Sequence, residues 1–302
     1  MGYEALKNNV NGNDNIAWGH KALQFNTEGN NNIAIGKYSL NNTTSGENNI
    51  ALGTESLLNN TEGHNNIAFG TGALKRNDTG FNNIAMGELS MLSNTGGKNN
   101  VGMGIGSLKS NTTGSSNVAM GVDNLSANTT GTNNVGIGFE SLRNNVSGLN
   151  NVASGVQAQF SNRRGNNNVS MGARSLYNNQ GDNNIGIGFS CGTSEPEVAG
   201  GVNLTKHAIS IGNQSYVDAN YSTAIGYKSK CSANATQSIA IGYKAVVDTP
   251  NTICMGNTSS TIFLPGENGG RPNITVNVNG TATTLEDYIN GLIEAAFVAR
   301  GL

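Results

Sequence analysis

The sequence repeats every 17 residues, and this spacing limits the possible folds more than any other feature. The hexapeptide NNIAIG at 31–36 recurs as NNIALG at 48–53 and as NNIAFG at 65–70. One glycine follows the same step without a gap from Gly19 to Gly172, and a step of 16 then leads to Gly188. A 17-residue unit is too short for a helix pair or a propeller blade. It suits one coil of a parallel β-solenoid, in which each coil stacks on the one before it.

Other residue types keep the same interval. A second glycine series runs from Gly12 to Gly165, and asparagine occupies every matching position from Asn32 to Asn168. A leucine column has methionine in one coil: Leu23, Leu40, Leu57, Leu74, Met91, Leu108, Leu125 and Leu142. Glycine is abundant, at 42 residues, and charged residues make up only 12% of the chain. Fixed apolar positions nevertheless separate this sequence from disordered low-complexity chains.

The IAIG segment is the predicted strand of each coil. Alternation puts Ile33 and Ile35 on one face, and Ala34 and Gly36 on the other. A strand that is apolar on both faces is covered on both. We expect the coil's own core, with its leucine column, to cover one face and a sister copy of the chain to cover the other. The small Ala/Gly side is expected to be the thin wall that presses against the sister copies.

The turns carry an Asn-x-x-Gly pattern, as at Asn60–Gly63. Glycine is expected there because it tolerates φ > 0. Identical asparagines stacked from coil to coil are expected to form hydrogen-bonded ladders along the rod. No proline occurs before Pro196, which supports continuous strand stacking.

The rhythm changes after Gly188 and predicts four regions. Residues 1–188 are a β-solenoid of 17-residue coils, and residues 189–206 are an excursion loop. Residues 207–262 continue the solenoid with coils of 14–16 residues, marked by Gly212, Gly226, Gly242 and Gly256. Residues 263–302 form a strand-turn-helix element. About fifteen coils would make a rod roughly 70 Å long.

The C-terminal region has the pattern of a trimerising element. A strand ending at Val278 is followed by a turn at Asn279–Gly280, and Thr283 with Glu286 forms a capping box for a short helix. Four residues of that helix make a heptad seam that is expected to pack in a bundle between chains. They are Leu285, Ile289, Leu292 and Ala296. At the other end, the repeat is already in register at Gly2, which favours a chain cut from a longer one.

Composition excludes several partners. The net charge of −2 offers no electrostatic footprint for nucleic acid or an anionic membrane. No run of about 18 apolar residues is present, so no membrane insertion is expected. The three cysteines, Cys191, Cys231 and Cys254, match no zinc spacing and are interpreted as buried or free thiols, which mildly favours assembly in a reducing compartment.

Two segments resemble a known family. STAIGYKSKCSA at 222–233 and SIAIGYKAVVD at 238–248 are similar to the head repeats of YadA-type trimeric adhesins. The 17-residue coils resemble the longer N-N-x-A-x-G variant found in fibre proteins of phages and large DNA viruses. The resemblance implies a left-handed parallel β-roll, a homotrimer and a surface-binding role. A complete bacterial adhesin would continue into a stalk and a membrane anchor, and nothing here matches an anchor.

No constellation points to catalysis, a cofactor or a metal. The chain has three histidines, of which His20 and His64 are interpreted as surface residues, and the acidic residues form no paired carboxylates of the glycosidase kind. A threonine column could bind ice or another repetitive surface, but its mixed neighbouring column argues against this. We therefore expect a protein that is not an enzyme and has no cofactor.

Two places are candidates for receptor contact. One coil departs from the pattern, with Ser154 for a large apolar residue, Gln159 for leucine, and Arg163 and Arg164 in the turn. This coil is either a tolerated irregularity or a contact patch. The excursion loop is the other candidate, because loops on rigid scaffolds often carry recognition. The candidate receptor contacts are Arg163, Arg164, Glu195, Glu197, Lys206 and His207.

The sequence thus predicts an all-β, homotrimeric solenoid with a short C-terminal helix. The favoured function is a structural fibre on the virion surface that attaches to a host cell-surface glycan or protein. The first alternative is the head of a bacterial trimeric autotransporter adhesin on the bacterial surface. The second is a fibre-borne glycan depolymerase, which would need a groove with two facing carboxylates.

Overall fold

The structure is a computed structural model that describes residues 2–192, 204–257, 275–278 and 281–284. The chain divides into two compact units, Met1–Thr258 and Ser259–Leu302. The described residues form strands and turns, with no helix among them.

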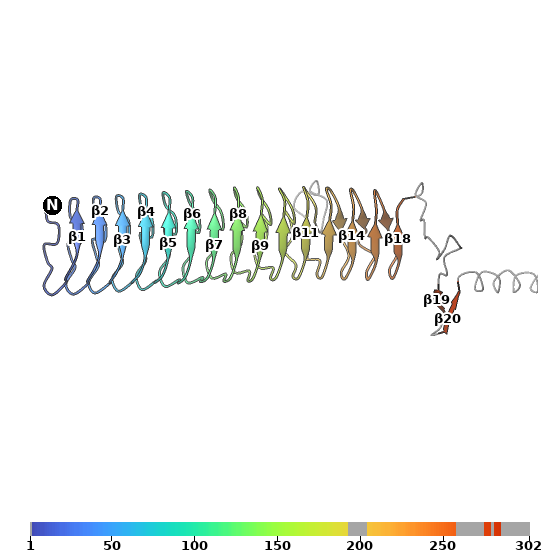
Figure 1. Ribbon diagram of the computed structural model, residues 1–302, viewed down its shortest axis with the longest axis horizontal. Coiled ribbons are helices and arrows are strands. Elements are labelled where there is room, and N and C mark those ends of the chain that lie inside the picture. Colours follow the sequence, from blue (N-terminus) through green and yellow to red (C-terminus); the bar gives the residue numbers. More distant parts are fainter. Residues whose placement is uncertain (1, 193–203, 258–274, 279–280, 285–302) are drawn as a thin grey trace, which may run out of the picture. The chain divides into compact units, whose positions relative to one another are not determined.

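The first unit is a stack of coils, each contributing one three-residue strand to a single long parallel sheet (Figure 1). This main sheet has fifteen strands in the order β1 to β12, β14, β16 and β18, whereas β13, β15 and β17 form a second, three-stranded parallel sheet. Main-sheet strands are β1 (Ile16–Trp18), β2 (Ile33–Ile35), β3 (Ile50–Leu52), β4 (Ile67–Phe69), β5 (Ile84–Met86), β6 (Val101–Met103), β7 (Val118–Met120), β8 (Val135–Ile137), β9 (Val152–Ser154), β10 (Val169–Met171), β11 (Ile185–Ile187), β12 (Ile209–Ile211), β14 (Thr223–Ile225), β16 (Ile239–Ile241) and β18 (Ile253–Met255). The second sheet contains β13 (Tyr216–Val217), β15 (Lys230–Cys231) and β17 (Val246–Val247). The parallel β-solenoid predicted from the repeat is confirmed.

The two coil series form one continuous stack. Ile33 lies opposite Ile50 in the sheet, so the register follows the 17-residue step. Ile185 of β11 pairs directly with Ile209 of β12, although 24 positions separate them in the sequence. The chain therefore leaves the stack after β11 and returns to the next rung without a gap in the main sheet.

The core of each coil is narrow and lies between the small residues of the strand and the leucine column. Ala34, Ala51 and Ala68 are fully buried, as are Leu40 and Leu57. The large residues of the same strands point outward, and Ile35 and Phe69 are exposed. The expectation that the Ala/Gly side would press against sister copies is therefore wrong. The leucine side chains fill most of the coil interior, so only Ala, Gly or Ser fits opposite them, and the branched residues must face out.

Buried asparagines cross-link the coils in two ladders. In the first ladder, each side-chain amide donates to the amide oxygen of the preceding asparagine at 2.6–2.9 Å, and to the glycine carbonyl three residues further on. Its continuous members are Asn60, Asn77, Asn94, Asn111, Asn128 and Asn145. The ladder geometry expected from the Asn-x-x-Gly pattern is thus present.

The second ladder runs from Asn32 to Asn168, just before the strands. Each side-chain amide donates to the preceding asparagine oxygen at 3.0–3.2 Å and to a glycine carbonyl at 2.8–2.9 Å. The same oxygen also accepts the backbone N–H of the next coil, as between Asn49 and Asn32. One buried amide therefore satisfies groups on two coils, which removes the penalty for burying it.

The turn glycines have a different role from the one expected. Gly63 is not among the residues with positive φ, whereas the strand-end glycine Gly53 has φ of 136°. A Cβ on Gly63 would lie 2.2 Å from Asn60 Oδ1 and 2.6 Å from the Gly80 carbonyl oxygen. Glycine is required in the turn because the ladder and the next coil approach its backbone closely, and not because of its dihedral angle.

The leucine column adopts a backbone conformation that the sequence did not predict. Leu23, Leu40 and Leu57 have φ of 49°, 48° and 48°. Such left-handed positions cost about 1–3 kcal/mol each for a residue with a side chain. Each is held by a hydrogen bond to the neighbouring coil, such as that from Leu40 N to Ser56 O at 3.0 Å.

In the second unit, the described residues are an antiparallel hairpin. Strand β19 (Thr275–Val278) pairs with β20 (Thr281–Thr284), and Thr275 lies opposite Thr284. The heptad seam expected at Leu285, Ile289, Leu292 and Ala296 lies outside the described residues.

Two adjacent glycines provide a test of the packing. A Cβ on Gly97 would lie 2.3 Å from Asn94 Oδ1 and 2.5 Å from the Gly114 carbonyl oxygen, whereas a Cβ on Gly96 would meet only Thr79 Oγ1, at 3.5 Å. We expect Gly97→Ala to lower the free energy of unfolding by about 2–4 kcal/mol, because it displaces a ladder asparagine and a neighbouring coil. Gly96→Ala should change it by less than about 0.5 kcal/mol. Urea denaturation followed by circular dichroism measures both, and equal effects would contradict this packing.

Candidate interaction surfaces

The outward residues of the main sheet form an apolar stripe along the rod. Each of the fifteen strands contributes its first and third residues to this stripe. All are apolar except Ser154 and Thr223, and no charged residue interrupts them. Exposed members include Trp18, Ile35, Phe69, Met86, Met120, Ile137, Met171, Ile187, Ile241 and Met255.

The stripe is too large to be ordinary surface. Large apolar patches on monomers rarely exceed a few hundred Å². Its thirty side chains are all partly or fully exposed, and a standard protein interface uses about 20–30 residues per partner. The stripe is therefore the strongest candidate for a protein interface in the described residues.

A third column widens the stripe in the middle of the rod. The residue after the strand-end glycine is polar in each of the first five coils that carry a strand, from His20 to Glu88, and becomes apolar at Ile105. Val122, Phe139, Val156 and Phe189 continue this column and are exposed. The column was not predicted from the sequence, although the change from Glu88 to Ile105 is visible there.

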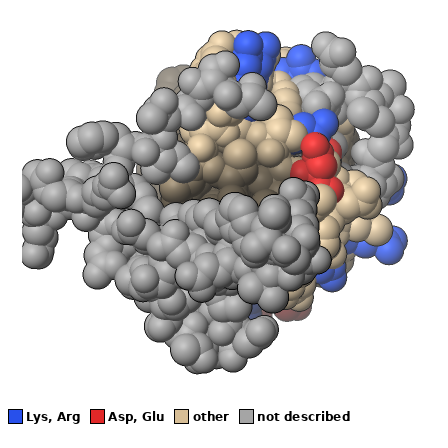
Figure 2. Space-filling view, turned by 90° about the vertical axis from the view of Figure 1, so that its right-hand side faces the viewer, with Lys and Arg blue, Asp and Glu red and all other residues tan. Residues whose placement is uncertain are grey.

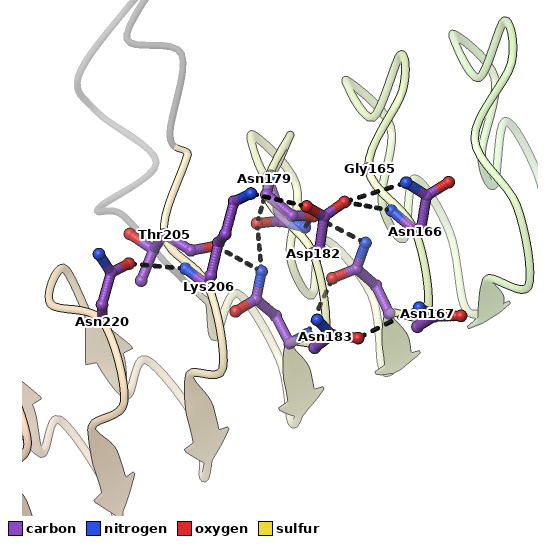
Figure 3. Close-up of polar contacts among 12 residues, drawn as sticks. Gly165, Asn166, Asn167, Asn179, Asp182, Asn183, Thr205, Lys206 and Asn220 are labelled. Atoms are coloured by element: carbon purple, nitrogen blue, oxygen red, sulfur yellow. Dashed lines mark hydrogen bonds and ion pairs between the residues drawn. The ribbon is translucent and has the colours of Figure 1, made fainter.

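The junction between the two coil series holds one candidate receptor residue in a structural ion pair (Figure 3). Lys206 Nζ lies 3.0 Å from Asp182 Oδ2, and the Lys206 backbone N–H donates to Asn220 Oδ1 at 2.8 Å. Asp182 Oδ1 also accepts the backbone and side-chain N–H groups of Asn166. Partial burial alone would raise the pKa of the Asp182 carboxyl, but Lys206 and Asn166 outweigh it and hold the pKa below its usual value.

The other predicted receptor residues make separate contacts where the structure describes them. The His207 ring stacks on Tyr221, with centroids 4.8 Å apart. Arg163 and Arg164 are exposed in the turn before β10. Within the described part of the chain, no hydrogen bond, ion pair or ring contact joins these arginines to Lys206 or His207. Glu195 and Glu197 lie outside the described residues.

The irregular coil is closed by altered hydrogen bonds. Gln159 takes the leucine position and is fully buried, and its amide donates to the Val152 carbonyl at 3.0 Å and the Asn168 carbonyl at 3.3 Å. The first asparagine ladder is interrupted here, because Asn162 donates only to Gly165 and Asn145 Oδ1 has no partner in the structure. The Gln159 amide oxygen also has no partner in the structure, so the repeated polar core is incomplete in this coil.

Aromatic and cationic side chains stack along the outside of the rod. Phe160 and Tyr177 lie parallel with centroids 5.1 Å apart, and the Arg174 guanidinium lies 4.9 Å from the Tyr177 centroid. His64 stacks on Phe81 at 4.9 Å, so this histidine belongs to a ring column. In the end-on view, Lys and Arg side chains appear at several separate places on the visible surface, and acidic side chains lie beside one of these groups (Figure 2).

The described residues contain neither a metal-binding cluster nor a membrane-spanning helix. No group of three or more His, Cys, Asp or Glu side chains in residues 2–192 and 204–257 could hold a metal ion. Those residues also form no helix with the length and apolar character that a membrane span needs. All three cysteines are free thiols; Cys191 and Cys231 are buried and Cys254 is partly exposed.

Comparison with known proteins identifies the repeats of the second coil series. Residues 206–229 and 233–259 match the family model of the YadA head domain repeat, in two copies. This part of the chain consists of YadA-type head repeats. The two matched segments are well under half of the chain. No curated protein sequence matches it.

Among solved structures, the chain is similar to the collagen-binding domain of the Yersinia adhesin YadA. The identity is 18%, the alignment covers 94% of this chain and 86% of that chain, and the TM-score is 0.25. The assignment of the fold therefore rests on the strand register of this chain itself.

The cysteines should differ sharply in reactivity. Burial raises the pKa of the Cys191 thiol to about 12 and also raises that of Cys231. Because the thiolate is the reactive form, we expect iodoacetamide at about pH 8 to label Cys254 first. Cys191 and Cys231 should react at least about 100-fold more slowly until the protein is unfolded. Peptide mass mapping after timed labelling measures this, and prompt labelling of Cys191 in the folded protein would contradict its burial.

Proposed function

We propose that the protein is a non-enzymatic, rod-shaped adhesin that assembles as a parallel homotrimer through the apolar stripe. The stripe carries this proposal, because it runs along all fifteen strands and contains no charge. A partner must offer an equally long apolar face with the same coil spacing. A second copy of the chain offers such a face because it carries the same stripe. The number three is supported by the resemblance of residues 206–259 to YadA head repeats.

Substitution on the stripe tests the assembly. We expect Met103→Lys with Met120→Lys to reduce the particle mass from three chains to one, because each interface would bury unpaired ammonium groups. Both positions are third residues of neighbouring strands, β6 and β7. Thr113→Lys with Thr130→Lys is the matched control, since both threonines lie in the turns away from the stripe.

Sedimentation equilibrium of the full chain gives the mass of each variant. A wild-type mass of one chain would refute the homotrimer. An unchanged mass in the Met103/Met120 variant, with a trimeric wild type, would move the interface away from the stripe.

The rod presents its surface to a host glycan or protein. Parallel copies would display every outward residue three times on one rigid scaffold, so weak contacts would add through avidity. Arg163 and Arg164 are the proposed contacts in the irregular coil, where both are exposed. Glu195, Glu197, Lys206 and His207 are retained as proposed contacts around the loop at 189–206.

A glycan array probed with the labelled full chain tests this attachment. We expect Arg163→Ala with Arg164→Ala to lower the array signal about tenfold or more, because the loss recurs in every copy. Arg76→Ala with Lys109→Ala removes the same charge from exposed positions in distant coils and should leave the signal unchanged. An equal loss of array signal in both variants would mean that net charge, and not these two arginines, causes the loss. Unchanged binding after deletion of 193–203 would remove that segment from the contact surface.

We place the rod on a virion surface, with a bacterial surface as the alternative. The 17-residue coils resemble the fibre variant of the repeat, which favours the virion. The YadA head repeats at 206–259 favour a bacterial autotransporter adhesin. A membrane-anchor barrel downstream in the full reading frame would decide for the bacterial surface, and a neighbourhood of virion structural genes would decide against it.

A further inference from the structure

A uniformly apolar stripe does not specify how two copies align. Every strand presents a similar pair of outward residues, so copies displaced by one coil would still bury fourteen of their fifteen strands. Flat, repetitive strand surfaces are prone to slippage for this reason. A rod of this kind needs a feature that recognises the correct register.

The stripe has two polar interruptions, and they lie on different strands and in different columns. Ser154 is the third residue of β9, between Ile137 and Met171 on the adjacent strands. Thr223 is the first residue of β14, between Ile209 and Ile239. Both side chains are partly exposed, and neither hydroxyl has a hydrogen-bond partner among the described residues. Their positions are the ninth and the thirteenth of the fifteen strands.

We propose that Ser154 and Thr223 fix the alignment of the copies of the chain as parallel and in register; this rests on the proposed association through the apolar stripe. In the in-register assembly, the Ser154 hydroxyls of all copies lie at one level and the Thr223 hydroxyls at another. A hydroxyl both donates and accepts, so the hydroxyls of one level can satisfy one another directly or through a bridging water. A single buried polar residue fixes register in coiled coils by the same logic.

Other alignments leave these hydroxyls unpaired. A shift by one coil places Ser154 against Ile137 or Met171 of the next copy, and Thr223 against Ile209 or Ile239. An antiparallel pair with full overlap would place the ninth strand against the seventh, so that Ser154 meets Met120. An unpaired buried hydroxyl should disfavour each such alignment about tenfold. Because Ser154 and Thr223 lie on different coils, each adds its own free-energy cost to a wrong alignment.

Disulfide trapping between copies measures the alignment. Two tagged chains of full length are co-expressed, one with Met103→Cys and the other with Met120→Cys. These residues lie opposite each other on neighbouring strands. A disulfide needs Cβ atoms within about 4.5 Å, and adjacent coils are about 4.8 Å apart. In-register copies therefore give 103–103 and 120–120 bridges, and copies displaced by one coil give 103–120 bridges.

We expect the mixed bridge to be less than about a tenth of the total in the otherwise unchanged chain. Ser154→Ile with Thr223→Ile should raise its share at least about fivefold while the assembled mass stays constant. Adding Met171→Ser to that variant restores one hydroxyl level and should lower the mixed share again. The control, Thr113→Ile with Thr130→Ile, adds the same apolar bulk in the turns off the stripe and should have no effect.

The outcomes separate the two proposals. A full assembled mass with the same mixed share in all variants would overturn the register role of Ser154 and Thr223 and leave the stripe as the interface. Frequent mixed bridges in the unchanged chain would overturn it as well. A mass of one chain for the unchanged protein would refute the association on which the register proposal depends.

Discussion

Each coil of this rod must follow the path of the coil before it, because backbone hydrogen bonds join equivalent positions of neighbouring coils. Ile33 N donates to Asn49 O and Ile50 N donates to Asn66 O, both at 2.8 Å, and the same bond recurs along the stack. A side chain in one coil therefore has to pack between the equivalent side chains of the coils on either side. This constraint produces the residue columns. It also explains why Gly97 cannot be replaced without moving a second coil, since atoms of the next coil lie within 3 Å of the place that a Cβ would take.

Asparagine can serve in the interior of such a stack because its amide carries a donor and an acceptor at one end. Translation along the rod brings the donor of Asn77 to the acceptor of Asn60, and that of Asn94 to Asn77, without any change of conformation. A leucine column can only pack. The ladder hydrogen bonds thus form only where an asparagine stacks on an asparagine. The ladder is interrupted where the residue type changes, as at Thr43, whose buried hydroxyl has no partner in the structure.

The coil length, the strands and the asparagine ladders could be predicted from the sequence, because each depends on identical residues at a fixed interval. The internal face of the strand could not. Alternation puts Ile35 and Ala34 on opposite faces of the strand but does not say which face is buried. The buried face depends on how much volume Leu40 occupies inside a narrow coil. The left-handed backbone of Leu40 was also missed, since leucine rarely adopts it. Of the candidate contacts, Lys206 proved to hold Asp182 across the junction of the two coil series, a pairing between residues that the sequence separates by 24 positions.

The division of the surface also limits where attachment can evolve. Side chains of the ladders and of the leucine column are committed to neighbouring coils, and the apolar stripe would be covered in an assembled rod. Even the exposed threonine column is partly committed, since Thr27 and Thr44 donate their hydroxyls to backbone carbonyls of the next coil. The positions that vary freely are the outward turn residues beside it, which include Glu28, Ser45 and Arg164. The proposed attachment would use turn positions of this kind, where a change does not have to be repeated in the next coil, and the proposed contacts Arg163 and Arg164 lie in such a turn.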